Sequence, residues 1–178
     1  PVPQKAKERS WVTAGGLCVG ELAGVHMPGV PRVQRQIAFV SSLPAEHHHQ
    51  LELLLFFNGC QDRVRNGIVT AIDRYGPPEI LVEGATLRVR VAGPTEVQCL
   101  FAIEREGKVS RPIGVILYLR DSFERITVLH LVIDEAYAAG GPRARYNLLL
   151  RLVQAVRRVA RCTSGIRHVE LLYSHHRP

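Results

Sequence analysis

The sequence predicts an α+β fold in which helices flank a mixed, mostly antiparallel central sheet. Residues 126–133 read ITVLHLVI, and an apolar run on both faces is typical of a strand in the middle of a sheet. Several shorter apolar runs precede it and predict an antiparallel meander of three or four strands. Residues 142–162 predict a helix that crosses over the sheet. Its apolar positions recur at helical spacing: Tyr146, Leu149, Val153, Val156 and Ala160.

The first half of the domain is predicted as one strand followed by two helices. A short apolar run over 36–40 indicates the strand. Ser42 and Pro44 then mark a helix start, because serine caps a helix and proline suits its first turn. A second helix over 62–75 has apolar residues four apart and ends at Gly76.

Strands are predicted for most of the second half. Residues 86–92 alternate strictly between apolar and polar side chains, which predicts a strand with one solvated face, near a sheet edge. Residues 97–104 and 112–119 flank an Arg-Glu-Gly-Lys turn and form a hairpin. After the helical crossover, residues 166–173 form the final strand, which runs parallel to strand 126–133.

Length and composition bound the domain organisation. The chain has 178 residues, 46% of them hydrophobic, which suffices for one compact domain. We therefore expect a single domain over 36–178, preceded by an irregular N-terminal arm over 1–35. No apolar run approaches the ~20 residues of a membrane span, so we expect a cytoplasmic protein with no membrane contact.

Charge and histidine content limit the kinds of partner that the chain is expected to have. A formal net charge of +7 suits a nucleic acid, an acidic protein or a phosphorylated cofactor. No metal is expected, although His47, His48 and His49 are consecutive. Neighbouring helical residues point about 100° apart and cannot converge on one ion, so these histidines are predicted to form a polar rim of the first helix.

A glycine-rich turn joins the strand over 126–133 to the helix over 142–162. The amides at such a helix start and the positive end of its dipole favour an anion. Arg143 and Arg145 nevertheless place two cations on the predicted first turn, where the dipole disfavours them. A bound polyanion would reverse that unfavourable interaction.

The element order, with the sequence LHLVIDEAYAAGGPRARYNLLLRLVQAVRRVAR, resembles the GCN5-related N-acetyltransferase (GNAT) superfamily over residues 36–173. The resemblance implies an acyl-CoA N-acyltransferase-like fold and transfer of an acyl group from acetyl-CoA or another acyl-CoA to an amine acceptor. It implies that backbone groups of Leu131, Val132 and Ile133 pair with the pantetheine arm. It assigns the pyrophosphate to the glycine-rich turn, at Ala138, Ala139, Gly140, Gly141, Arg143, Ala144 and Arg145.

Five residues are candidates for proton transfer. His130 lies in the strand where some members of that superfamily place a base; the alternative is a hydrogen-bonded histidine in a sheet interior. Glu124, like Asp134 and Glu135, flanks the strand and would act as a base if desolvated, whereas most acids at strand ends are solvated. Tyr173 closes the last strand as a candidate acid, with packing as the alternative.

Three functional classes stay open. The first is the acyltransferase. The second is a non-catalytic module of the same fold that binds CoA or a protein partner, which the turn's departure from the superfamily's glycine spacing favours. The third is nucleic-acid binding through the arginine-rich face of helix 142–162, which an aromatic content of only 6% disfavours. We also expect the edge of the final strand to be covered by the N-terminal arm or by a second copy in a homodimer.

Overall fold

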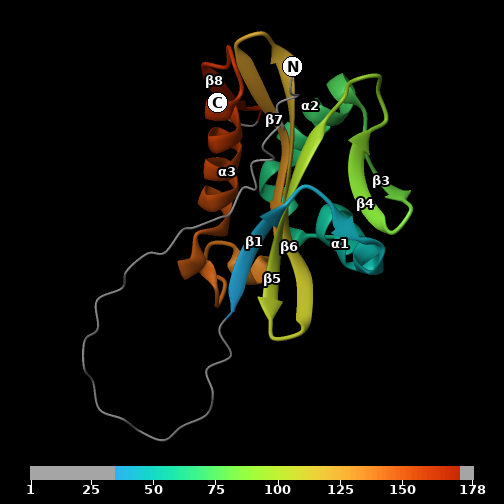
Figure 1. Ribbon diagram of the computed structural model, residues 1–178, viewed down its shortest axis with the longest axis vertical. Coiled ribbons are helices and arrows are strands. Elements are labelled where there is room, and N and C mark those ends of the chain that lie inside the picture. Colours follow the sequence, from blue (N-terminus) through green and yellow to red (C-terminus); the bar gives the residue numbers. More distant parts are fainter. Residues whose placement is uncertain (1–34, 173–178) are drawn as a thin grey trace, which may run out of the picture. The chain divides into compact units, whose positions relative to one another are not determined.

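The computed structural model describes residues 35–172. Residues 1–34 of the predicted N-terminal arm, and Tyr173, lie outside this range. Within it the chain is a mixed α/β structure with three α-helices and a mostly antiparallel five-stranded sheet, as predicted. The strand order is β1-β5-β6-β7-β8, and β7 and β8 form the only parallel pair of this sheet within the described range (Figure 1).

The predicted order of strand, two helices, meander, helix and strand is confirmed in the described range. Residues 126–133 form a strand that has a neighbour on each side as far as Val128, and the last strand runs parallel to it. The principal elements are β1 (Gln36–Val40), β2 (Leu43–Pro44), α1 (His48–Phe56), α2 (Arg65–Tyr75), β3 (Pro78–Glu83), β4 (Thr86–Val91), β5 (Gln98–Glu106), β6 (Val109–Ser122), β7 (Arg125–Ile133), α3 (Leu148–Cys162) and β8 (His168–Leu171).

A second, three-stranded sheet has the order β2-β4-β3. The alternation predicted for residues 86–92 is confirmed, but their place at an edge of the central sheet is wrong, because β4 is the middle strand of this second sheet. Its partner β3 begins at Pro78, shortly after α2 ends at Tyr75. The sequence predicted only a helix end at Gly76, and the apolar run that follows was missed.

The first helix begins later than Ser42 and Pro44 predicted. Pro44 pairs with Thr86 in β2, and a single 3-10 turn precedes α1, which starts at His48. The prediction that His47 belongs to a polar rim is also wrong. Its side chain is buried, and its two ring nitrogens lie 3.1 Å from Gln50 Oε1 and 3.1 Å from Ser110 Oγ.

Helices cover both faces of the five-stranded sheet (Figure 1). α3 packs on one face through residues one turn apart, and α1 and β4 pack on the other. β5, β6 and β7 contribute side chains to both apolar layers and are therefore buried from both sides. The α3 layer contains Leu148, Leu152, Val156 and Ala160; the opposite layer contains Leu51, Leu54, Leu55, Leu87 and Val89.

The last helix does not begin at residue 142. α3 begins at Leu148, after a 3-10 turn and after Asn147, which has a left-handed backbone conformation with φ +48°. Asparagine adopts that conformation more readily than most residues, so it ends the 3-10 turn and redirects the chain into the helix. Arg143 and Arg145 consequently lie in the preceding turn and not in the first turn of α3.

Candidate functional site

A β-bulge in β7 sets the geometry of the site. Leu117 of β6 pairs with His130, whereas the next residue, Tyr118, pairs with Val128, so Leu129 is an extra residue in β7. Strict alternation from Val128 would turn His130 toward the α3 face. The bulge instead places both Leu129 and His130 on the face covered by α2, where they line one cavity.

The described pairing of β7 with β8 ends at the same point. Their parallel register covers Arg125–Val128 against His168–Leu171, while β7 continues to Ile133 beside β6 alone in the described part of the chain. Bulges bend and twist a strand, and this one lies next to the last pair with β8. Within the described range, the edge of β7 from Leu131 to Ile133 therefore has no strand beside it on the β8 side.

Backbone groups of Leu131 and Ile133 point to this edge of β7. The amide of Asp134 donates to the carbonyl of Ile113 across the β6 ladder at 2.8 Å. Hydrogen-bonded and non-hydrogen-bonded pairs alternate along antiparallel strands, so Ile133 and Leu131 direct their amides and carbonyls away from β6, whereas Val132 directs its own toward β6. The Ile133 carbonyl accepts a hydrogen bond from Asn58 Nδ2 at 2.7 Å.

His130 lines an apolar cavity of about 250 Å³ between α1, α2, β4, β6 and β7. Its side chain is 7% exposed, and burial lowers its pKa from 6.5 to about 4, so the ring is neutral at pH 7. Most of the wall is hydrocarbon. It includes Leu55, Ile68, Ile72, Val91, Leu117 and Leu129.

A second buried polar cluster lies at the other end of the meander, around Glu104. This carboxylate is 4% exposed and accepts hydrogen bonds from Tyr137 Oη, from Arg111 Nε at 2.9 Å and from an Arg143 guanidinium nitrogen at 2.8 Å. Burial alone would raise the pKa of Glu104, but these hydrogen bonds and the two positive charges hold it below the usual glutamate value. We call this group, together with Asp134 bound to Arg111, the Glu104 network.

The glycine-rich turn uses many of its own amides. The N–H groups of Ala138, Gly141, Arg143 and Ala144 donate to carbonyls between Glu135 and Gly141. A Cβ atom on Gly141 would lie 2.5 Å from two carbonyl oxygens, so only glycine fits there. Four of the amides expected to hold a pyrophosphate therefore hold the turn together, and Pro142 has none.

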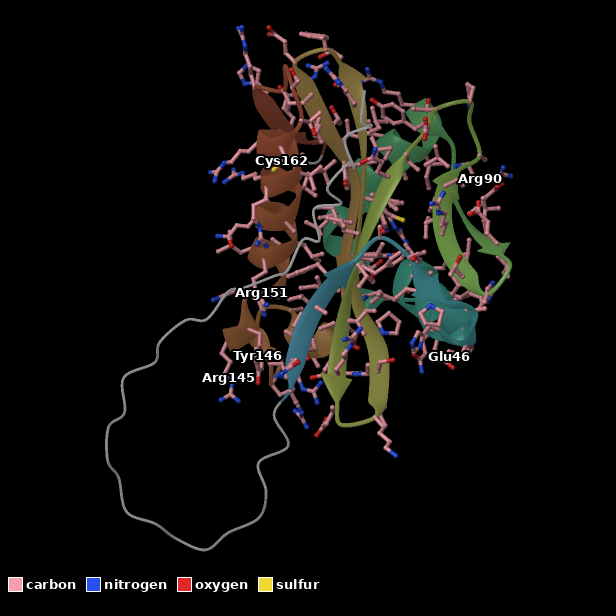
Figure 2. All side chains as sticks on the ribbon, viewed as in Figure 1. Glu46, Arg90, Arg145, Tyr146, Arg151 and Cys162 are labelled. Atoms are coloured by element: carbon pink, nitrogen blue, oxygen red, sulfur yellow. The ribbon has the colours of Figure 1, made fainter. Side chains whose placement is uncertain are left out.

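The two arginines of that turn differ in role. Arg143 points inward to Glu104, whereas Arg145 is exposed, stacks on the Tyr146 ring and points away from the sheet near the start of α3 (Figure 2). The first amides of α3, at Leu148, Leu149 and Leu150, have no carbonyl of the helix four residues earlier to donate to; the first such bond runs from the Arg151 amide to the Asn147 carbonyl at 3.0 Å. An anion in this region would meet those amides and Arg145.

The other candidates for proton transfer within the described range are not brought to His130. Glu124 lies in the turn before β7, at the opposite end of the strand, and pairs with Arg167 at 3.3 Å. Asp134 caps the 3-10 turn that follows β7 by accepting from the Ala136 amide, and Glu135 accepts from the Gly59 amide at 2.9 Å. Tyr173 falls outside the described residues.

Sequence reasoning missed the Glu104 network and the cavity wall supplied by α2. One signal for the network was present, because Glu104 interrupts an apolar strand that reads QCLFAIERE. A charged residue at a buried strand position requires partners. Arg111 is only seven residues away, opposite Glu104 across the hairpin, whereas Tyr137 and Arg143 are 33 and 39 residues away and gave no signal of their own.

Some negative observations bound the chemistry. Across residues 35–172, no three histidine, cysteine, aspartate or glutamate side chains are grouped so as to hold a metal ion. None of the helices in that range is long and apolar enough to cross a membrane. No protein-family model, curated protein or solved structure matches this chain.

Proposed function

We propose that this chain is an acyl-CoA-dependent N-acyltransferase that acts on an amine. The observation that carries the proposal is the edge of β7 beyond the bulge, which presents the backbone of Leu131 and the amide of Ile133. The pantetheine arm of CoA contains two amides in an extended chain. Such an arm can add to an exposed strand edge as a peptide strand does, through backbone hydrogen bonds.

The position of α3 supports one orientation of the cofactor. Phosphates favour the amino-terminal end of a helix, where amides are free to donate and the dipole is positive. α3 begins on the side of the Ile133 end of β7, next to the exposed Arg145. With the phosphates there, the thioester lies at the other end of this strand edge, beside the bulge and His130.

His130 is suited to the proton transfer. The amine nitrogen attacks the thioester carbonyl carbon, a C–N bond forms and the C–S bond breaks, giving an amide and the thiol of CoA. The amine loses one proton, which neutral His130 accepts and which then passes to the departing sulfur. The cavity on the α2 face of β7 provides room for the amine on the side of the sheet opposite α3.

Binding of CoA tests the proposal directly. We expect calorimetry to detect binding of CoA. Leu131→Pro should weaken that binding at least tenfold, because proline removes an amide that points to the outer edge of β7 and is not used in the β6 ladder. Leu131→Ala is the matched control, since it shortens the same side chain and keeps the amide. No binding of CoA at millimolar concentration by the unsubstituted protein would overturn the proposal.

A second candidate, a non-catalytic module that binds CoA or a protein partner, is favoured by the turn. Four of its amides are used internally and Arg143 is bound to Glu104, which leaves fewer groups for a pyrophosphate. This candidate predicts that CoA, if bound, protects the protein against heating while no thiol is released from acetyl-CoA with any amine offered.

A further inference from the structure

The cavity next to His130 restricts what can bind in it. Its volume, about 250 Å³, exceeds the roughly 150 Å³ of an apolar cavity that admits benzene, so it has room for one ring with a short chain. It is too small for a peptide or a nucleotide, whose sites span several hundred cubic ångströms or more.

The charge of the wall excludes ions. None of the described residues that line the cavity is acidic, and its titratable side chains are His130 and Tyr75. His130 is neutral at pH 7. An ammonium ion placed there would lose its hydration without gaining a counter-charge, which costs several kcal/mol. The same cost applies to a carboxylate.

A neutral amine meets neither obstacle. Its carbon skeleton packs on side chains such as Ile68 and Ile72 of α2, and its nitrogen requires a hydrogen-bond acceptor, which a neutral imidazole provides. The unprotonated nitrogen is also the form that has a lone pair for attack on a thioester. The wall therefore selects the reactive form of the amine.

We propose that the His130 cavity binds a small apolar amine as its neutral free base, and that this amine is the acyl acceptor. The second clause rests on the proposed acyltransferase function; the first does not. Polyamines, amino acids and lysine side chains of proteins are excluded as acceptors, because each carries further charges or a chain that the cavity cannot take in.

The test uses three probes of one shape with the whole chain and without CoA. 2-Phenylethylamine should bind with an affinity that rises about tenfold per pH unit between pH 7 and 9, since the free-base fraction of an alkylamine with a pKa near 10 rises by that factor. 2-Phenylethanol should bind with no such dependence. Trimethyl(2-phenylethyl)ammonium, which is permanently charged, should not bind.

Two variants on α2 locate the site. Ile72→Trp should weaken the binding of phenylethylamine and of phenylethanol at least tenfold, because the larger side chain fills the cavity. Val69→Trp should not weaken it, because Val69 is exposed on the same helix and does not line the cavity. Equal binding by both variants would show that the probes do not bind in the His130 cavity. Binding of the amine without pH dependence, or binding of the trimethylammonium probe, would contradict the claim that the amine binds as its neutral free base.

Acetylation separates this inference from the proposed function. Transfer from acetyl-CoA to phenylethylamine, but not to spermidine or a lysine peptide, supports both. Transfer to spermidine or the peptide alone keeps the acyltransferase and overturns the apolar acceptor. If phenylethylamine binds with the expected pH dependence but CoA does not bind, the cavity still takes a neutral apolar amine. The proposed acyltransferase function, and the amine's role as acyl acceptor, are then wrong.

Discussion

The His130 cavity and the Glu104 network both bury polar groups against the same sheet, yet their surroundings differ. Glu104 has Tyr137, Arg111 and Arg143 around it, and its charge is satisfied within the fold. His130 lies in a wall that is mostly hydrocarbon, beside space for a ligand. A buried charge that is balanced within the fold stabilises the structure, whereas a neutral side chain that lines a roomy apolar space can meet a ligand there.

The largest effect should come from His130. His130→Gln should lower turnover by about 10² to 10⁴, the usual contribution of a general base, while CoA binding and the fold persist. Turnover is measured by release of the CoA thiol. His47→Gln is the matched control, because His47 is equally buried but has both ring nitrogens engaged away from the cavity. A loss of stability with unchanged turnover per folded molecule would refute the catalytic role.

The Glu104 network should affect stability and not chemistry. Glu104→Ala should lower the free energy of unfolding by about 3 kcal/mol, because two arginines and a tyrosine lose a buried partner. Glu106→Ala also breaks a glutamate–arginine pair, but with the exposed Arg35, and should cost no more than about 1 kcal/mol. Urea unfolding measures both; similar values for the two variants would contradict the contrast.

The pH dependence of stability distinguishes the two regions further. The folded pKa of His130 lies near 4, below the unfolded value near 6.5, so its contribution is present above pH 6.5 and is lost as pH falls toward 4. Between pH 7.5 and 5 this should remove roughly 2 kcal/mol, because the unfolded state takes up the proton first. The lowered pKa of Glu104 acts in the same direction, but only below about pH 4.3, the unfolded glutamate value. His130→Gln should abolish the loss above pH 5; an unchanged slope would contradict it.

The smallest effects should separate the two arginines of the turn. Arg143→Ala should lower the free energy of unfolding by about 1 to 2 kcal/mol, because it removes a charge-assisted hydrogen bond to Glu104. Arg145→Ala should leave the free energy of unfolding unchanged and weaken the binding of CoA by roughly 1 kcal/mol, since Arg145 is exposed beside the start of α3. Urea unfolding and calorimetry on both variants check this; equal effects on CoA would indicate that Arg143 leaves Glu104 when ligand binds.

Patterns with a regular period were predictable, and departures from them were not. Apolar alternation and helical spacing located most strands and helices and the parallel final pair. Nothing in ITVLHLVI marks Leu129 as an extra residue, because apolar residues on both sides hide a change of face. The start of α3 was misplaced because Asn147 interrupts an otherwise helical pattern. The glycine-rich turn and the resemblance predicted both turn arginines as ligands, and the sequence did not indicate that Arg143 binds Glu104, which is 39 residues away.

The bulge makes the bend of β7 at the site a matter of chain length and not of residue identity. If Leu129 were deleted, His130 would still stand opposite Leu117 and every later residue would keep its place in the β6 register. What would disappear is the extra step of about 3.3 Å along one strand, and with it the local bend and twist of β7. A one-codon deletion would therefore straighten the strand beneath the cavity while leaving almost every side chain of the site in the sequence.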